Sequence, residues 1–459
     1  MTPMTARMRA RTRRATAAGV AIATALLGMT ACTSSAPNAT SSAKASHFTI
    51  TVPTSQAPWN PAYAKLIQAY EQDTGNKVVL RAFPNPDVKT QEVNDIQGKS
   101  NTFDVFQINE QDLVQFNENK WIQPFTDVDP TYKPDSQIYS YSNIGRWDAS
   151  KKLFDSSGKY TNLPILGNVD IFMYRKDIYK KLGLSVPKTW DQVIANGKKI
   201  EAANVIKYAG VYRTQGVAGT YAATFEFQAL LNSAGGAWFK QPGTNWTPTA
   251  ASKAGVQAAT WFRELAEQGP SATTTIGQAQ AIAEMQSGDA AQTYLVAAGA
   301  AQLEDPNNSS VAGKIGYAPL PETPSGKSSA ATGLWSLAIP SGLPKVRAQH
   351  ALEFINWITS KSAQILFAKN GGIPVRSEAY APSVLPTSAK APLAVVNKTA
   401  ANLPSTFTSL RYSFSTAMLN ITEPGLEKIA AGTVSPEDGM RAINSQLASL
   451  VAQQKLPTG

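Results

Sequence analysis

Residues 162–193 read NLPILGNVDIFMYRKDIYKKLGLSVPKTWDQV. The apolar run at residues 171–174 predicts a strand, and residues 177–182 predict a helix that the following glycine ends. Thr189 and Gln192 form a capping-box pattern, which indicates that another helix begins there. This order of strand and helices indicates an α/β fold.

Strands and helices continue to alternate on both sides of this stretch. Phe48, Ile50 and Val52 alternate with polar residues and predict the first strand. A helix follows, with Asn60 as the expected N-cap and Pro61 at its first helical position. Further strands are expected at 77–83, 103–108, 290–296 and 334–340, and further helices near 249–268, 277–287 and after Ser435. Such alternation predicts mostly parallel sheets that are covered by helices on both faces.

The positive charge of the chain is concentrated at its N-terminus. Five of the 42 basic residues lie in the first fourteen positions, and the first acidic residue is Glu71. After residue 31 there remain 37 basic residues (42 minus five) and 32 acidic residues, a net charge of +5. A nucleic-acid-binding protein usually carries a dense basic stripe, and none follows residue 31. We therefore expect no nucleic-acid partner.

Residues 1–31 have the three parts of a secretory signal: a basic end, an apolar run and small residues before a cut. Arg13 and Arg14 leave the twin-arginine route open beside the general secretory route. The apolar run is marginal for crossing a membrane, and no later stretch predicts a transmembrane helix. We therefore predict an exported protein whose mature part begins at residue 32.

Cys32 is the only cysteine of the chain. Together with the preceding residues LLGMTA it resembles a bacterial lipobox, although Met29 stands where leucine is usual. The resemblance predicts that Cys32 is lipidated and becomes the new N-terminus; the alternative is an ordinary cleaved leader with an incidental cysteine. Residues 33–44 are almost all Ser, Thr, Ala, Asn and Pro, so residues 32–45 are expected to form a lipid anchor and flexible tether.

Four pieces of the sequence together resemble the extracellular solute-binding proteins of ABC importers. They are most similar to the carbohydrate-binding family, family 1, which includes maltose- and trehalose-binding proteins. The first piece is residues 162–193, with Tyr-Arg-Lys-Asp after a strand and Pro-x-Thr-Trp before a helix. The others are AIAEMQSGDAAQTYL (281–295), TGLWSLAIP (332–340, with Leu334 in place of a glycine) and NGGIPVRSEAY (370–380). The resemblance extends from about residue 46 to residue 455.

The resemblance implies a two-lobed, periplasmic-binding-protein-like α/β fold of type II, with mixed, mostly parallel sheets flanked by helices. Three hinge crossovers would join the lobes, and we expect them near residues 163–168, 290–293 and 333–335. The first lobe would then contain residues 46–164 and 291–332, and the second lobe residues 165–290 and 333–459.

The implied function is that of a lipid-anchored receptor on the extracytoplasmic face of the bacterial cell membrane. Such a receptor binds a sugar or oligosaccharide between its lobes, closes around it, and delivers it to the permease subunits of an ABC importer. A polyol or a glycerophosphodiester-type solute remains an alternative. The receptor is expected to be a monomer.

A sugar site needs flat aromatic rings for the sugar rings and planar polar side chains for the hydroxyl groups. Trp59 and Asn60 follow the first strand, at the carboxyl end where open α/β sheets bind ligands. Asn109, where the family often has an aspartate, and Glu110 follow the strand at 103–108. Trp59 could instead pack within its own lobe, and Glu110 could simply begin a helix.

The resemblance adds further candidates. Asn168 stands where relatives often carry an aspartate that contacts sugar, and Asp170 points to the same side of the strand. The aromatic additions are Tyr294 and Trp335, although Trp335 could also be a core residue. Arg213 and Arg376 are the basic candidates for solute binding. Arg213 could instead cap a helix, and Arg376 could instead form a structural ion pair.

An enzyme is the main alternative class. The two histidines, His47 and His350, belong to no catalytic motif, and no metal-ligand cluster or phosphate-binding glycine loop is present in the sequence. A two-carboxylate glycosidase stays open, but no pair stands out among the 32 acidic residues. We expect a receptor without enzyme activity, metal or cofactor; an adhesin without transport is the remaining alternative.

Overall fold

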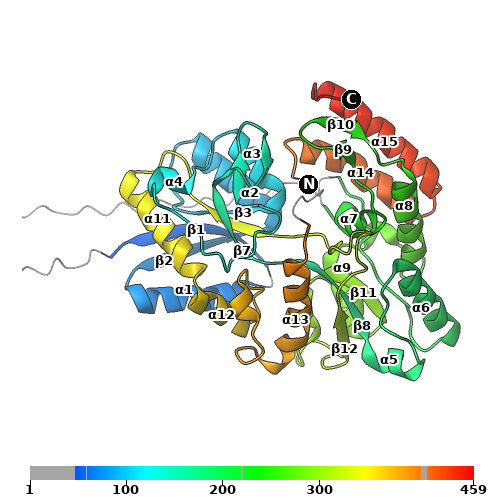
Figure 1. The fold of residues 1–459 in the computed structure, drawn as a ribbon. Helices are drawn as coiled ribbons and strands as arrows, with labels where there is room; N and C mark the ends of the chain where they lie inside the picture. The colour runs from blue at the N-terminus through cyan, green and yellow to red at the C-terminus, as the bar shows by residue number, and fades with distance from the viewer. Residues whose placement is uncertain (1–46, 58, 219–220, 405–410) are drawn as a thin grey trace, which may run out of the picture. The chain divides into compact units, whose positions relative to one another are not determined.

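The computed structural model describes residues 47–57, 59–218, 221–404 and 411–459 (Figure 1). His47–Gly459 form one compact unit. The predicted signal peptide, Cys32 and the tether lie outside the described residues. We call residues 47–166 and 335–380 the first lobe, and residues 170–331 and 411–459 the second lobe, because the strands of each range pair among themselves.

The first lobe contains two small sheets with helices around them. Its main elements are β1 (Thr49–Ser55), α1 (Asn60–Thr74), β2 (Lys77–Phe83), α2 (Asn85–Gln97), β3 (Phe106–Asn109), α3 (Leu113–Glu118), α4 (Phe125–Val128), β7 (Asn162–Leu166), β13 (Trp335–Ala338), α11 (Lys345–Ile358) and α12 (Lys361–Lys369). Strands β1 and β2 pair in parallel. Strand β13 lies between β3 and β7 and is antiparallel to both.

The second lobe is built around β8, which pairs antiparallel with β11 on one side and with β12 on the other. Its main elements are β8 (Asp170–Arg175), α5 (Lys176–Lys181), α6 (Trp190–Ala203), α7 (Ala223–Ser233), α8 (Lys253–Ala266), α9 (Gln278–Ser287), β11 (Gln292–Val296), α10 (Gly299–Leu303), β12 (Ile315–Ala318), α14 (Ser415–Ala430) and α15 (Pro436–Gln453). Helices α7, α8, α14 and α15 pack against one another beside this sheet (Figure 1).

The remaining elements are short, except for the 15-residue helix α13. They are β4 (Arg146–Asp148), β5 (Leu153–Phe154) and β6 (Lys159–Tyr160), which form one antiparallel sheet, β9 (Phe239–Gln241) and β10 (Asn245–Pro248), which form another, the 3-10 helices η1 (Glu110–Asp112), η2 (Thr273–Thr275) and η3 (Ser377–Tyr380), and α13 (Thr387–Ala401).

Local sequence signals place the helix ends largely as expected. In α6, the Thr189 hydroxyl accepts the N–H of Gln192 at 3.2 Å, as the capping-box pattern predicts. Helix α1 ends at Gly75, whose φ of 75° suits a residue without a side chain. Asn60 is the first residue of α1 rather than its N-cap, because the preceding Trp59 takes that position.

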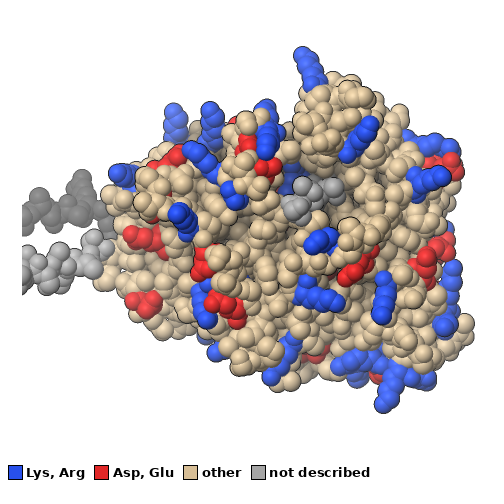
Figure 2. Space-filling model, in the orientation of Figure 1, with Lys and Arg blue, Asp and Glu red and all other residues tan. Residues whose placement is uncertain are grey.

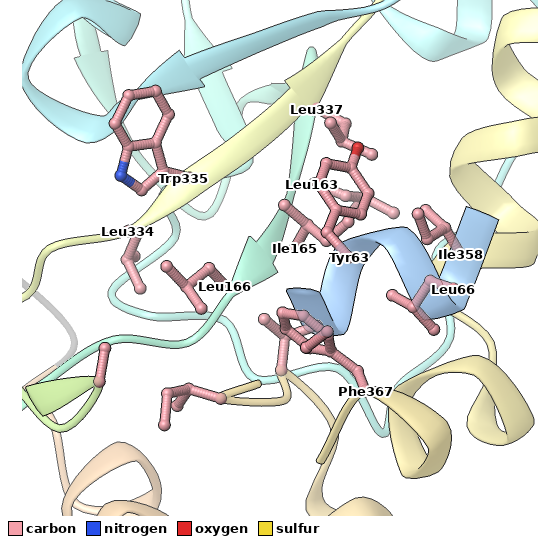
Figure 3. Packing of buried hydrophobic residues seen from close by; sticks show 14 of the residues in the cluster. Tyr63, Leu66, Leu163, Ile165, Leu166, Leu334, Trp335, Leu337, Ile358 and Phe367 are labelled. Carbon is pink, nitrogen blue, oxygen red and sulfur yellow. The ribbon is translucent and has the colours of Figure 1, made fainter. Parts of the chain in front are cut away.

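Two apolar clusters fill the molecule. The first occupies the first lobe, where Tyr63 and Leu66 of α1 pack with Leu163 and Leu337 (Figure 3), and it continues into the second lobe through β8, α9, β11 and α10. The second cluster covers the opposite face of β8 and the four packed helices of the second lobe. The first cluster is thus shared by both lobes, and each lobe has its own sheets with helices around them, which confirms the predicted two-lobed α/β fold.

Three connections join the lobes. The first is residues 167–169, between β7 and β8, and the second is residues 332–334, between β12 and β13. These two run antiparallel, with a bridge between Val169 and Thr332. The third passes through α13, which packs against β8 and β12 of the second lobe and against η3 of the first.

The predicted assignment of segments to lobes requires correction. Strand β11, which was expected at the second crossover and in the first lobe, lies within the second lobe, where it pairs with β8. Strand β13 was expected in the second lobe, but it pairs with β3 and β7 in the first. Residues 291–331 therefore lie in the second lobe and residues 335–380 in the first, the reverse of the prediction, whereas residues 411–459 stay in the second lobe. A strand's apolar pattern identifies it as a strand without identifying its partner.

The predicted mostly parallel pairing is also wrong for the named strands. Among them only β1 and β2 pair in parallel, and the pairs formed by β3 to β13 are antiparallel. No helix in the described part of the chain is long and apolar enough to cross a membrane.

Charged side chains of both signs are spread over the face shown in Figure 2. Basic side chains gather around α5, where Lys176, Lys180, Lys181 and Lys188 are exposed. The rest of that face mixes blue and red side chains.

Candidate functional site

Two of the predicted aromatic residues lie together in the first lobe. Trp59 begins α1 just after β1, and Trp335 begins β13, opposite Asn109 of β3 and Leu166 of β7. The two indole rings are 5.8 Å apart between centroids and tilted by 51°. Figure 3 shows the Trp335 ring at one end of β13, apart from the side chains of Leu163 and Ile165. Such a pair offers two aromatic surfaces at one edge of the lobe.

Several buried polar atoms in β1, in β3 and at the start of α1 have no hydrogen-bond partner among the described residues. They are the side-chain oxygens of Thr54 and Ser55 in β1, Trp59 Nε1, Asn60 Oδ1 and Gln107 Oε1 in β3. Burying a polar group without a partner is costly, so natural proteins keep few of them. The set contains donors and acceptors, which suits hydroxyl groups because a hydroxyl both donates and accepts.

The second lobe contributes a buried charge cluster at the start of β8. Arg213 forms an ion pair with Glu226 of α7, with Nη2 2.9 Å from Oε2, and lies 3.7 Å from Asp170 Oδ1. Its guanidinium also lies over the Phe225 ring, 4.3 Å from the centroid. One cation therefore faces two carboxylates in a region closed to solvent, since Asp170 and Glu226 are fully buried.

Asp170 is the less well compensated of these two carboxylates. Neither of its side-chain oxygens has a hydrogen-bond donor among the described residues. Burial raises the pKa of the Asp170 carboxyl well above its ordinary value, because Arg213 offsets only part of that cost and Glu226 adds to it. Burial also raises the pKa of Glu226, although Arg213 donates to that side chain directly. Asp170 is thus a buried acceptor without a hydrogen-bond donor of its own in the described part of the chain.

Two other predicted residues form hydrogen bonds at the connections between the lobes. Asn168 Oδ1 accepts the N–H of Ala298 at 3.1 Å. The carboxylate of Glu110 accepts hydrogen bonds from Thr332, from the N–H of Leu334 and from Arg411. These contacts hold both side chains within the protein.

Asn109 lies closer to the tryptophan pair. It is half-buried at the end of β3, and its Oδ1 accepts the N–H of Gln111 at 3.2 Å, which caps η1. Asn109 is also the partner of Trp335 in the strand register.

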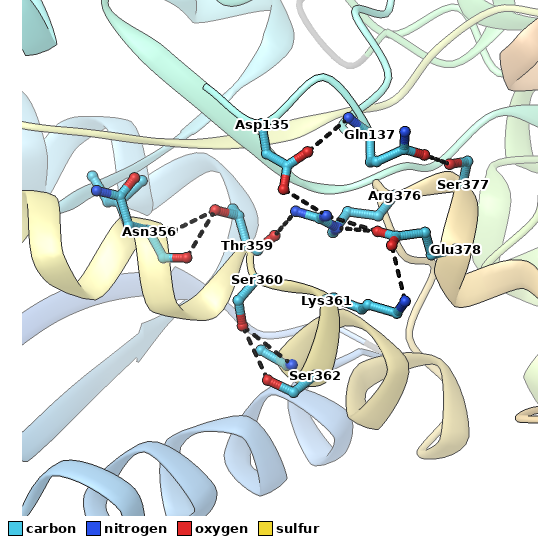
Figure 4. A network of polar contacts seen from close by, with 12 residues as sticks. Asp135, Gln137, Asn356, Thr359, Ser360, Lys361, Ser362, Arg376, Ser377 and Glu378 are labelled. Carbon is cyan, nitrogen blue, oxygen red and sulfur yellow. Dashed lines mark hydrogen bonds and ion pairs between the residues drawn. The ribbon is translucent and has the colours of Figure 1, made fainter. Parts of the chain in front are cut away.

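Tyr294 borders the charge cluster, and Arg376 lies away from it. Tyr294 is fully buried, donates its hydroxyl to the Glu226 carbonyl at 3.0 Å, and packs against Trp190. Arg376 forms ion pairs with Asp135 and Glu378, both at 2.7 Å, and donates to the carbonyl of Thr359 (Figure 4). The alternative reading of Arg376, a structural ion pair, is the one that the structure supports.

The sequence reasoning did not identify Glu226 or Arg411. Glu226 had a local signal, because it is the one charged residue of α7, and an isolated acid in an apolar helix usually has a buried partner. Arg411 had no such signal: its partner Glu110 lies about 300 positions earlier in the chain. Among the described residues, no group of three or more His, Cys, Asp and Glu side chains could hold a metal ion.

Comparison with known proteins gives consistent results. Residues 54–365 match the model of a family described as bacterial extracellular solute-binding protein. A probable amino-acid ABC transporter periplasmic-binding protein of Sinorhizobium fredii is 28% identical over 229 residues, which are 49% of each chain. The mannitol-binding protein of Pseudomonas aeruginosa is 25% identical over 283 residues, 61% of each chain. The matched part thus spans between about half and three fifths of these curated relatives.

Among solved structures, an ABC transporter solute-binding protein from Agrobacterium radiobacter K84, in complex with ribitol, has a TM-score of 0.72. It is 21% identical, and the match covers 88% of this chain and 98% of that one. At this identity the likeness concerns the fold.

Proposed function

Because the chain belongs to the family of bacterial extracellular solute-binding proteins, we propose that it captures a neutral sugar or polyol and passes it to an ABC importer. The observation that carries this proposal is the combination of the Trp59–Trp335 ring pair with the buried Asp170 carboxylate. The rings would pack on the C–H faces of the solute, and the carboxylate would accept hydrogen bonds from its hydroxyl groups. The similar mannitol-binding protein supports this solute class.

The charge balance favours a neutral solute over a glycerophosphodiester. An anionic solute needs a cation with free donors, as phosphate sites usually provide. Here Arg213 is already shared between Asp170 and Glu226, and these two carboxylates outnumber it. A phosphate brought into this cluster would have to compete with Asp170 and Glu226 for the single guanidinium in a buried region, which opposes binding.

The proposed solute-binding side chains come from both lobes. The first lobe would provide Trp59, Asn60, Asn109 and Trp335, and the second lobe Asp170, with Arg213 fixing its orientation. Closure of the lobes around the solute would bring the two groups together. Glu110, Asn168, Tyr294 and Arg376 are left out because their polar groups are bonded within the protein.

We also propose that Cys32 carries the lipid anchor and that residues 33–45 tether the receptor to the extracytoplasmic face of the membrane as a monomer. This part of the proposal rests on the sequence, since residues 1–46 lie outside the described residues. The permease partner follows from the family and from the names of the similar proteins.

A thermal-shift screen tests the solute class. Residues 45–459 would be heated with D-mannitol, ribitol, maltose and glycerophosphocholine. A solute present at a hundred times its dissociation constant should add about 2.7 kcal/mol to the free energy of unfolding. We expect a shift with at least one neutral compound and none with glycerophosphocholine; a shift with glycerophosphocholine alone would contradict the charge argument.

The same mixtures test the receptor role. Chromatography after incubation should recover the bound solute unchanged, because the proposed site holds it without a catalytic pair. Conversion of maltose to glucose would instead indicate a glycosidase.

A further inference from the structure

Arg411 joins the second lobe to the first. It lies between α13 and α14 and is buried, with 5% of its surface exposed. Its Nε donates to Glu110 Oε1 at 2.8 Å, and its terminal nitrogens donate to the carbonyl oxygens of Ser142 and Tyr141, both at 3.0 Å. All three partners belong to the first lobe. A guanidinium with planar, fixed donors can hold such a set of acceptors in one arrangement.

Glu110 extends this contact to the second connection. Besides Arg411, its Oε1 accepts the hydroxyl of Thr332 at 2.7 Å, and its Oε2 accepts the N–H of Leu334 at 3.1 Å. The N–H of Glu110 donates in return to the Leu334 carbonyl at 3.0 Å. Glu110 therefore binds residues 332–334 and Arg411 through one buried carboxylate.

Tyr141 extends the contact to the first connection. Tyr141, Ser142 and Asn143 have φ values of 43°, 57° and 62°, a left-handed run that residues with side chains rarely adopt. This run directs the carbonyls of Tyr141 and Ser142 to the same guanidinium. The Tyr141 hydroxyl lies against Gly167, so closely that a Cβ there would be 2.1 Å from it.

The backbone of Arg411 is held by the second lobe. The next aromatic residues, Tyr412 and Phe414, stack on each other with centroids 5.5 Å apart. Each also packs edge-on against Trp246, with centroids 5.1 Å apart, within the second apolar cluster. Arg411 must therefore move with the second lobe while its side chain stays bonded to the first.

We propose that Arg411 and Glu110 are positioning residues that fasten the three connections to one another and so fix the axis about which the lobes move. Arg411 follows the third connection, α13, and reaches the second connection through Glu110 and the first through Tyr141. Without this fastening each connection could adjust separately. Solute-binding groups on opposite lobes, such as Trp335 and Asp170, would then no longer return to one arrangement.

Amide hydrogen exchange followed by mass spectrometry tests this proposal without any solute, so its outcome is independent of the proposed solute class. Arg411→Lys keeps the charge but replaces the planar donor set by one ammonium. We expect peptides covering residues 168–172 and 330–336 to exchange at least tenfold faster in Arg411→Lys than in the wild-type protein. Peptides from β1 and α15 should exchange as in the wild type, because local opening need not involve the lobe interiors.

Arg376→Lys is the matched control. Arg376 is equally buried, with 4% exposed, and also binds carboxylates and a backbone carbonyl, but it lies outside the connections. We expect this variant to leave exchange in residues 168–172 and 330–336 unchanged. Glu110→Gln is a second variant, milder than Arg411→Lys because it keeps the size of the side chain, and should open the same peptides.

Two results would overturn the proposal. One is wild-type exchange of the connection peptides in both Arg411→Lys and Glu110→Gln. The other is equally faster exchange throughout the protein, which would indicate that the ion pair only adds to general stability.

Discussion

Replacing Asp170 by Asn should change stability and solute affinity in opposite directions. The substitution keeps the shape of the side chain and removes its charge. In the wild-type protein Arg213 faces both Asp170 and Glu226, and Asp170 has no hydrogen-bond donor of its own among the described residues. With Asn at position 170, Arg213 and Glu226 become a balanced pair. The solute-free protein should therefore become more stable at neutral and alkaline pH.

The pH dependence of this gain follows from the direction of the pKa shift. Folding raises the pKa of Asp170, so its contribution to stability is full below the pKa of the unfolded chain and is lost as the pH rises through the folded value. Each pKa unit of such a shift corresponds to about 1.4 kcal/mol. The variant should match the wild type near pH 4 and exceed it increasingly towards pH 8.

Solute affinity should fall in the same variant. A hydrogen bond to a charged acceptor contributes roughly 1.5–3 kcal/mol, which corresponds to about a 10- to 150-fold rise in Kd. Titration calorimetry with the solute found in the thermal-shift screen would measure it. Asp289→Asn is a suitable control, because Asp289 is partly exposed and pairs with Lys207 on the surface.

The reasoning would be refuted by the reverse pattern. If Asp170→Asn left Kd unchanged and lowered the melting temperature at pH 8, Asp170 would serve as a counter-ion that Arg213 requires. The proposed acceptor for solute hydroxyl groups would then have to be sought elsewhere.

Three other substitutions have defined outcomes. Glu226→Gln should lower the free energy of unfolding by about 3 kcal/mol, because it breaks the 2.9 Å ion pair with buried Arg213. Urea unfolding would measure the loss. A loss under about 0.5 kcal/mol, which is the scale of a neutral surface change, would show that Asp170 suffices as the partner of Arg213. Trp335→Ala should weaken solute binding at least tenfold. It should also lower the free energy of unfolding by about 3–5 kcal/mol, since the ring is 4% exposed. If calorimetry gave the wild-type affinity, the ring would serve only in the core. Cys32→Ser should release the receptor from membranes with solute affinity intact, and mass spectrometry of the wild-type N-terminus should find a lipidated cysteine rather than a free one.

The sequence by itself determined the local elements and the class of the fold. Tyr63, Leu66, Ile67 and Tyr70 recur in the sequence at helical spacing, and all four are buried on α1. The Thr189 cap and the glycine that ends α1 also follow from short-range signals. These predictions hold because a helix face or a cap depends on residues a few positions apart, whose geometry the backbone imposes.

Only the tertiary structure decided which lobe a segment joins and what each buried charge faces. The apolar strands β11 and β13 look alike in sequence, yet one pairs with β8 and the other with β3 and β7. Among the charges, Arg376 meets two nearby acids, whereas Arg213 meets Asp170 and Glu226 beside the proposed site. Apolar periodicity in the sequence indicates that a side chain is buried, and a charge in an apolar segment indicates that it has a partner. The identity of that partner depends on contacts between distant residues, such as Arg411 and Glu110, which form only when the lobes have packed.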